Sequence, residues 1–311
     1  MRVILTDQVF PTVSLERDEF SRHGHEFLVA SNESEALTLI EDADAILTTY
    51  MPLPAKVIGT MKKARIIARY GIGVDNIDVR AAAAKGIAVT NVPDYCVEEV
   101  ATHAVAMALA MVRGLPSADA AVRQGEWGVN TVRPLRRLSS LTVGLLGVGR
   151  IGGAVARTLA TLGPKLIAHD PYAAELPPGV LPVSLEEVFK NSDLLLLHAP
   201  LTEATKGLVN ASRIDSMKDG AYIVNVARGP LIVLEDLLAA LRSGKLRGAG
   251  IDTFPQEPLP DVSILEDVPG LLLSPHTAFY SEEALVESQR KAIAQVVKVL
   301  HGQSPDYLIA P

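Results

Sequence analysis

The chain has little cysteine and no excess of positive charge. It contains one cysteine, Cys96, in 311 residues, so no internal disulfide can form and a reducing, cytoplasmic setting is expected. With no second cysteine and no clustered histidines, we expect no metal site. The net charge of −7 argues against nucleic-acid binding, because phosphate contacts need a concentrated basic face. The local basic cluster Arg133, Arg136 and Arg137 is interpreted as a solvated surface.

Long apolar runs are also missing. No run reaches the length that spans a bilayer, and the opening "MRVILTD" turns polar too soon for a signal peptide, so we expect no membrane partner. Hydrophobic residues make up 48% and charged residues 21% of the chain, which is the composition of a folded protein. The length allows one large domain or two ordinary ones.

Short apolar runs alternate with helical stretches along the chain. Because these runs are apolar almost throughout, they predict parallel strands that are covered on both faces, and therefore an α/β architecture. The predicted strands are residues 2–7, 26–30, 44–49, 64–70, 87–92, 141–147, 165–170, 193–199, 221–227, 248–252 and 271–275.

A largely apolar helix over 96–113 interrupts the alternation, with Met107 and Met111 expected in the core. A second series of strands follows it, and the chain ends in another long helix, 281–301. This order predicts two Rossmann-like, doubly wound parallel-sheet domains with a cleft between them. One is discontinuous, formed by 1–98 and 282–311, and the other spans 99–281.

The segment "GVGRIG" follows a predicted strand and opens a predicted helix. In this context Gly147 permits a tight turn, Gly149 lets the backbone approach a pyrophosphate, and Gly152 allows close packing of helix and strand. Asp170 ends the next strand, where a carboxylate binds ribose hydroxyls and repels a 2′-phosphate, so NAD is favoured over NADP. The alternative is a glycine turn that caps a helix, with an unrelated aspartate. The predicted cofactor contacts of this segment are Gly147, Gly149, Arg150, Ile151, Gly152 and Asp170.

Four charged or titratable residues follow later predicted strands: Arg228, Asp252, Glu257 and His276. Ligands of open α/β sheets bind at the carboxyl ends of the strands, so these side chains are expected at one edge. Hydride transfer to a carbonyl needs a proton donor, for which histidine suits neutral pH. A carboxylate would favour the protonated imidazole, and an arginine fork would bind a substrate carboxylate. The plainer alternative is that His276 only caps its turn.

Several motifs together resemble the NAD-dependent D-2-hydroxyacid dehydrogenase family over nearly the whole chain. They are "RYGIGVDNID" (69–78), "GIAVTNVPDYCVEEVATHA" (86–104), "GVGRIG" (147–152), "NVARGPL" (225–231), "GIDTFPQEP" (250–258) and "SPHTAF" (274–279). Within the family, "SPHTAFYSEEAL" and "NVPDYC" are most similar to the branch of the C-terminal-binding-protein co-repressors and their bacterial relatives.

The resemblance implies roles for individual residues. Arg228 would bind the carboxylate and carbonyl of the substrate, Glu257 would tune the imidazole, and His276 would be the acid/base. Residues 1–98 and 282–311 would bind the substrate, and 99–281 would bind NAD. The further substrate contacts implied are Arg69, the backbone N–H groups of Ile72 and Gly73, and Phe279. The further cofactor contacts implied are Pro200, Thr205, Val226, Arg228, Asp252 and His276. Family members are usually homodimers.

The sequence departs from the family pattern at three positions. Pro230 and Val233 stand where a glycine and a helix-capping aspartate are common, so the next helix should start weakly. Phe279 stands where the co-repressor branch has tryptophan. The segment after His276 also differs from the phosphoglycerate dehydrogenase branch, which makes that activity a lower alternative.

The sequence therefore predicts an oxidoreductase that acts on the CH–OH group of a small 2-hydroxy acid, or reduces a 2-oxo acid, with NAD(H). The alternative from another class is an NAD(H)-sensing binding protein like the co-repressors, with weak or no turnover. Which acid is used, and in which direction, does not follow from these residues.

Overall fold

The computed structural model describes residues 1–310 and divides the chain into two compact units. The first comprises Met1–Tyr95 and the segment that starts at Ser281, and the second comprises Cys96–Tyr280. The predicted domain boundaries lie within three residues of these bounds. The roles assigned to the two predicted domains stay predictions here.

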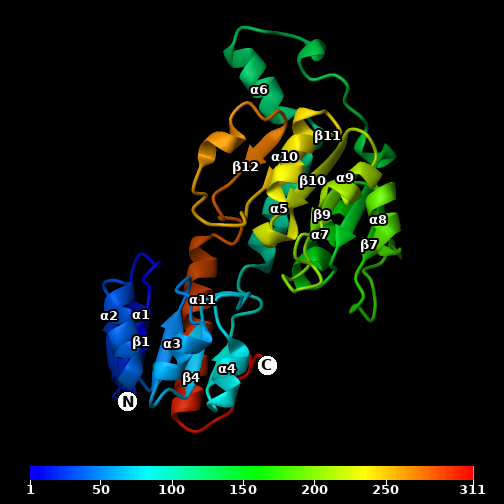
Figure 1. Cartoon of the computed structure of the whole chain (residues 1–311). Coiled ribbons are helices and arrows are strands. Elements are labelled where there is room, and N and C mark those ends of the chain that lie inside the picture. The colour runs from blue at the N-terminus through cyan, green and yellow to red at the C-terminus, as the bar shows by residue number, and fades with distance from the viewer. Residues whose placement is uncertain (311) are drawn as a thin grey trace. The chain divides into compact units, whose positions relative to one another are not determined.

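The first unit is built on a five-stranded sheet in the order β2-β1-β3-β4-β5, with all neighbouring strands parallel. Figure 1 labels β1 and β4 of this sheet. Its strands are β1 (Arg2–Leu5), β2 (Glu26–Val29), β3 (Ala45–Thr48), β4 (Ile66–Arg69) and β5 (Ala88–Thr90). Its helices are α1 (Ser14–Arg22), α2 (Glu33–Leu39), the 3-10 helix η1 (Ile40–Asp42), α3 (Ala55–Thr60), α4 (Val79–Ala84) and α11 (Glu282–Leu300).

The second unit has a seven-stranded parallel sheet in the order β12-β11-β10-β9-β6-β7-β8. Its strands are β6 (Thr142–Leu146), β7 (Lys165–His169), β8 (Val180–Pro182), β9 (Leu194–Leu197), β10 (Ala221–Asn225), β11 (Leu246–Ile251) and β12 (Leu271–Leu273). Its α-helices are α5 (Val97–Val112), α6 (Leu115–Arg123), α7 (Arg150–Ala160), α8 (Leu185–Asn191), α9 (Ala211–Ser216) and α10 (Leu234–Arg242). Its 3-10 helices are η2 (Val129–Thr131), η3 (Leu138–Ser140), η4 (Gly229–Leu231) and η5 (Val262–Leu265).

The predicted α/β class with two doubly wound parallel sheets is confirmed. The central strands are apolar because both faces of each sheet are covered: all four residues of β3 and of β9 are buried. In each unit the strand order reverses at one point, between β1 and β3 in the first and between β6 and β9 in the second. Open α/β sheets bind ligands beside such a point, at the carboxyl ends of the strands.

The long helix α5 packs in the core of the second unit. Met107 and Met111 are buried, as predicted, and both approach Gly250 of β11, where an added Cβ would lie 3.2 Å from the Met107 sulfur. The glycine thus lets helix and sheet pack closely. Among residues 1–310 no single helix is long and apolar enough to cross a membrane. In the same range only α5 and α6 taken together reach that length and hydrophobicity, and they are bent by 59° against each other.

The sequence did not predict β8 or α6. β8 is a three-residue edge strand that ends in proline, which weakens the strand pattern. α6 begins after Gly114, which takes a left-handed φ of 63° and turns the chain away from α5.

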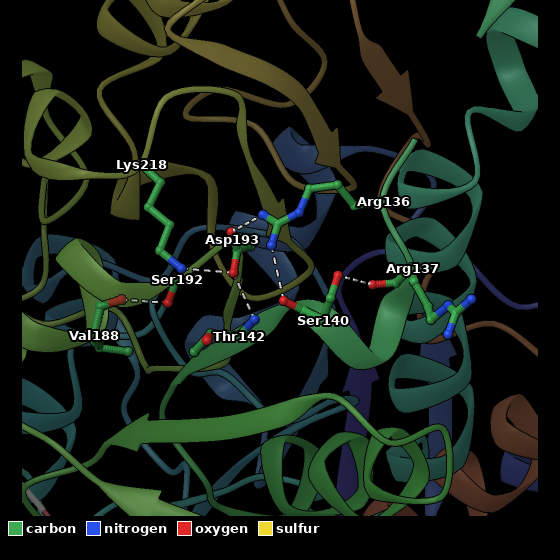
Figure 2. Close-up of polar contacts among 8 residues, drawn as sticks. All are labelled: Arg136, Arg137, Ser140, Thr142, Val188, Ser192, Asp193 and Lys218. Atoms are coloured by element: carbon green, nitrogen blue, oxygen red, sulfur yellow. Dashed lines mark hydrogen bonds and ion pairs between the residues drawn. The ribbon is translucent and has the colours of Figure 1, made fainter. Parts of the chain in front are cut away.

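Arg133, Arg136 and Arg137 are exposed, as interpreted from the sequence, but Arg136 also forms a specific ion pair. Figure 2 shows its guanidinium directed at Asp193, which precedes β9; the Nη1–Oδ1 distance is 2.5 Å. The same carboxylate accepts from Lys218 Nζ and from the backbone N–H of Thr142, each at 2.8 Å (Figure 2). This network ties the connector before β6 to the amino edge of the sheet.

Candidate active site

The glycine segment forms a tight turn between β6 and α7. Gly147 has φ 89°, and a Cβ there would lie 2.9 Å from the backbone of His198. A Cβ on Gly152 would lie 2.2 Å from the carbonyl oxygen of Gly147, so helix and turn meet too closely for any side chain. Gly149 is different, because a Cβ there meets no atom within 4 Å. A side chain at Gly147 or Gly152 would therefore clash with the protein, whereas a Cβ at Gly149 would meet only open space.

Asp170 holds this turn in place. Its Oδ2 accepts a hydrogen bond from the backbone N–H of Val148 (2.8 Å), and its Oδ1 accepts from that of Tyr172 (2.9 Å). The carboxylate therefore lies at the end of β7 and next to the turn that follows β6. A carboxylate oxygen can accept more than one bond, so ribose hydroxyls could bind there as well.

These features fit NAD. Open space at Gly149 lies where α7 begins, and the first N–H groups of a helix favour a phosphate. A second observation is the buried Nε2 of His198, which has no hydrogen-bond partner among the described residues. His198 follows β9, the strand next to β6 at the point where the strand order reverses. A polar atom left unpaired there is available to a polar group of a bound ligand.

His198 was not singled out from the sequence. Burial lowers the pKa of its imidazole to about 4, so the ring is neutral at physiological pH. The available signal was its position, directly after an all-leucine strand and at the carboxyl edge of the sheet.

The other predicted cofactor residues of the second unit lie at the same edge of the sheet. Thr205 orders the loop after β9, since its hydroxyl donates to the carbonyl of Pro200 (2.7 Å) and accepts from the N–H of Thr202 (2.8 Å). Val226 directly follows β10 and is buried. Arg150 and Ile151 form the first turn of α7.

His276 and Glu257 form a close pair. The Nδ1 of His276 lies 2.5 Å from Oε2 of Glu257, and Oε1 of Glu257 accepts from the backbone N–H of Phe254 at 2.7 Å. Burial raises the pKa of the Glu257 carboxyl, but the hydrogen bonds from His276 and Phe254, with the nearby charge of Arg228, outweigh it and lower that pKa. Glu257 is thus kept ionised beside the imidazole. The predicted grouping of Arg228, Glu257 and His276 is consistent with these contacts.

Arg228 is presented by a tightly packed turn. It is followed by Gly229, at which a Cβ would lie 1.9 Å from the backbone carbonyl carbon of Phe254. Only glycine lets the turns after β10 and β11 approach so closely. The Nη1 of Arg228 donates to the carbonyl of Ala227 (2.7 Å), and its own carbonyl accepts from Asn225 Nδ2 (2.9 Å).

Asp252 holds the backbone around His276. His276 has φ 53°, a left-handed conformation that is uncommon for residues other than glycine. The carbonyl of Asp252 accepts from the N–H of His276 (2.7 Å), and its carboxylate accepts from those of Thr277 (2.9 Å) and Ala278 (3.1 Å). Three successive backbone groups therefore fix the turn that presents the imidazole.

The sequence also did not single out Ser274 and His103. Ser274 Oγ donates to Oδ1 of the fully buried Asp252 (2.6 Å), and His103 Nε2 lies 2.9 Å from the same hydroxyl oxygen. The signal for Ser274 was its place inside "SPHTAF". The sequence carries no such signal for His103, because α5 lies far from Asp252 and Ser274 along the chain. Phe279, predicted as a pocket wall, lies edge-on to the His276 ring at a centroid distance of 6.0 Å.

The remaining predicted substrate residues belong to the first unit. Arg69 ends β4, and its Nε donates to the carbonyl of Thr49 (3.2 Å). The carbonyl of Ile72 accepts from Asn91 Nδ2 (2.7 Å), which orders the loop containing Gly73.

The helix after Arg228 begins without a side-chain cap, and its weak start stays a prediction. α10 begins after Val233, which has no side-chain hydrogen bond to the helix. The backbone N–H of Val233 instead donates to the carbonyl of Val209 (2.9 Å). Buried Leu237 and Leu238 anchor the helix on the sheet, so packing stabilises it where the cap does not.

Comparison with known proteins identifies the family. Residues 105–278 match the model of the D-isomer specific 2-hydroxyacid dehydrogenase NAD-binding domain. The chain is 35% identical to a glyoxylate reductase of Korarchaeum cryptofilum, over 87% of this chain and 83% of that protein. It is 36% identical to a D-3-phosphoglycerate dehydrogenase of Methanocaldococcus jannaschii, over 89% of this chain but 53% of that protein. The chain thus spans about half the length of that relative.

A solved structure agrees with this result over the whole length. D-lactate dehydrogenase from Aquifex aeolicus, in complex with NAD and lactic acid, superposes with a TM-score of 0.90 at 27% identity, and each chain is covered completely. The chain belongs to the D-isomer specific 2-hydroxyacid dehydrogenase family, and its cofactor is NAD.

Proposed function

We propose that this protein reduces a small 2-oxo acid to the D-2-hydroxy acid, and catalyses the reverse reaction, with His276 as the acid/base. The observation that carries the proposal is the 2.5 Å pair between His276 Nδ1 and Glu257 Oε2, beside Arg228 at a strand end. Bound NADH supplies the hydride for C2 of the substrate.

The proton comes from the imidazole. With Nδ1 directed at Glu257, Nε2 is the ring nitrogen that we assign to the transferable proton. In the reducing direction it donates this proton to the carbonyl oxygen as the hydride arrives, and in the oxidising direction it accepts the proton from the hydroxyl. The ionised Glu257 stabilises the imidazolium and fixes the orientation of the ring.

Cations and backbone N–H groups would hold the substrate. We assign the substrate carboxylate and carbonyl to Arg228, whose planar fork suits them, and further carboxylate contacts to Arg69 and to the N–H groups of Ile72 and Gly73. Phe279 would form an apolar wall. These assignments are supported by the match to the family motifs and by the hydrogen bonds that fix Arg69, Arg228 and the loop of Ile72.

Asp170 is proposed to select NAD over NADP. Its carboxylate already accepts two backbone hydrogen bonds and so stays at the end of β7, where it would repel a 2′-phosphate. Asp170→Ala is therefore expected to weaken NADH binding and to reduce the preference for NADH over NADPH in binding titrations. An unchanged preference would remove Asp170 from this role.

We propose that the protein forms a homodimer. Four large apolar side chains of α6 and the segment after it are exposed, and Trp127, 85% exposed, is the most prominent. The others are Leu115, Val122 and Val129. Exposed apolar side chains concentrated in one segment of 15 residues favour an interface with a second copy. Sedimentation analysis of the wild type and of Trp127→Ser would show a dimer that the substitution weakens; a wild-type monomer would refute the assignment.

The alternatives are less well supported. The comparisons are with enzymes, so an NAD(H)-sensing binding protein is not favoured. Phosphoglycerate dehydrogenase stays the lower alternative, because the segment after His276 differs from the pattern of that branch. The nearer resemblance to the co-repressor branch and the cytoplasmic setting stay predictions.

The test is the consumption of NADH by the purified protein with a panel of 2-oxo acids, from glyoxylate to aromatic acids. His276→Ala should lower kcat by roughly 10²- to 10⁴-fold with little change in the Kd for NADH. His169→Ala is the matched control, because His169 also ends a strand of the second unit and its Nδ1 donates to the carbonyl of Val183 (3.1 Å), not to a carboxylate. Equal losses in both variants, or a parallel loss of NADH binding, would refute the role of His276.

A further inference from the structure

One carboxylate of the first unit collects five hydrogen bonds. Asp7 follows β1, and its donors are Thr6 Oγ1 (2.5 Å), Thr48 Oγ1 (3.1 Å) and Thr49 N (3.0 Å) to Oδ1, and Tyr50 N (2.5 Å) and Met51 N (3.3 Å) to Oδ2. A carboxylate offers about four lone-pair sites, so its capacity is used up by these contacts. Three successive backbone N–H groups converge on one anion, an arrangement that strongly orders a loop.

The ordered loop lies where a ligand would be expected. Asp7 follows β1 and the loop follows β3, and these two strands flank the point at which the strand order of this sheet reverses. Loops at that point, at the carboxyl ends of the strands, form the ligand sites of open α/β sheets. Tyr50, between the bonded N–H groups of Thr49 and Met51, has 48% of its surface exposed.

The same loop holds Arg69. The carbonyl of Thr49 accepts from Arg69 Nε (3.2 Å), and the carbonyls of Thr49 and Met51 accept from Asn76 Nδ2 (3.4 and 2.9 Å). The guanidinium then lies over Gly71, where an added Cβ would be 1.8 Å from Arg69 Nη1. The orientation of Thr49, fixed by Asp7, thus sets the position of an arginine that we assign to the substrate.

We propose that Asp7 is a positioning residue that acts through residues 49–51 on Arg69 and Tyr50, and so sets the affinity for the 2-oxo acid and the side-chain length accepted. This inference rests on the proposed function. Without the anion, three N–H groups must find other partners, and the Thr49 carbonyl is free to turn away from Arg69. The substrate carboxylate would lose an aligned cation, and the side chain of the acid would lose a fixed wall at Tyr50.

The experiment compares Asp7→Ala and Asp7→Asn with Asp44→Asn as a matched control. Asp44 is also partly buried and also bonds a backbone N–H, that of Arg2 (2.7 Å), but it precedes β3 at the opposite edge of the same sheet. For each protein, kcat and KM are measured with glyoxylate and with 4-methyl-2-oxopentanoate, and the Kd for NADH is measured by fluorescence titration.

Asp7→Ala is expected to raise KM for the acids about 10-fold or more, with a smaller change in kcat, and to change the ratio of kcat/KM between the two acids at least about threefold. Asp7→Asn, which keeps one acceptor oxygen, should lie between the wild type and Asp7→Ala. Asp44→Asn should keep the wild-type ratio, and the Kd for NADH should stay within about twofold in all proteins.

Several outcomes would overturn the inference. Wild-type KM and acid preference in both Asp7 variants would show that the loop does not depend on the anion. If Asp44→Asn changes KM and acid preference as much as the Asp7 variants do, Asp7 acts only through general stability. If Asp7→Ala does not fold, the comparison of Asp7→Asn with the wild type and Asp44→Asn is the test. A wild type that reduces no acid in the panel would refute the proposed function first, and this inference with it.

Discussion

Gly149→Ala should separate cofactor binding from folding. An added Cβ meets no protein atom within 4 Å, and the φ of −62° is one that alanine adopts freely. Replacing glycine by alanine at a compatible position stabilises a protein by about 0.4–1 kcal/mol, because it restricts the unfolded chain. The apoprotein should therefore unfold at the same urea concentration as the wild type, or at a slightly higher one.

Cofactor binding should respond in the opposite direction. The new methyl group points into the space that we assign to the pyrophosphate, and overfilling a packed site costs about 1–3 kcal/mol. This cost corresponds to a Kd for NADH that is about 5- to 150-fold higher. Isothermal titration calorimetry with NADH measures it directly, on the same samples used for urea unfolding.

Gly153→Ala is the matched control, because Gly153 lies four residues after Gly149, in the first turns of α7. A Cβ there meets Arg157 Nη1 at 3.3 Å and the carbonyl oxygen of Val148 at 3.5 Å, so it faces the protein and only a flexible side chain must shift. This variant should bind NADH like the wild type. If a folded Gly149→Ala also binds NADH within twofold of the wild type, the pyrophosphate does not lie at Gly149, and the reasoning from open space fails.

Three further predictions test other contacts. Glu257→Gln removes the charge from the partner of His276, and a hydrogen bond to a charged group contributes about 1.5–3 kcal/mol. We therefore expect kcat to fall about 10- to 150-fold, with little change in the Kd for NADH. An unchanged kcat would show that the pair has no part in the reaction. Asp193→Ala leaves the N–H of Thr142 without its acceptor and removes the anion that pairs with Arg136 and Lys218. The free energy of unfolding in urea should therefore fall by about 1–3 kcal/mol. An unchanged free energy would mean that the network in Figure 2 does not stabilise the fold. Because burial lowers the pKa of His198 from 6.5 to about 4, the unfolded chain takes up a proton before the folded one as the pH falls, and stability should drop by about 2 kcal/mol between pH 7.5 and 5.0. His198→Leu should remove that share of the pH dependence, and an unchanged dependence would contradict the assignment.

Local patterns were enough to predict most of the fold. Buried parallel strands are apolar runs, and β1, β3, β9 and β10 could be read from such runs within a few residues. β8 was missed because its ladder with β7 comes from tertiary pairing, and its own three residues include a proline.

The site was predictable where it depends on strand ends, and not where it depends on distant contacts. His276 and Glu257 each follow a strand and could be selected by type and position. The partnership of Asp252 with Ser274 and His103 could not, because α5 reaches the sheet from a remote part of the chain. The ion pair of Arg136 could not be predicted for the same reason, since its partner Asp193 lies 57 residues away.

The three strand-end aspartates share one structural role that their sequence positions do not reveal. Each accepts backbone N–H groups from the loop after the neighbouring strand: Asp7 from residues 49–51, Asp170 from Val148, and Asp252 from Thr277 and Ala278. Such charge-assisted bonds to a carboxylate are about twice as strong as neutral ones, so they order these three loops. A loop ordered before binding loses less entropy when a ligand arrives. The carboxylates thus order the glycine turn, the turn of His276 and the loop of Tyr50 through the same kind of contact, and removing any one of them should weaken the function of its own loop first.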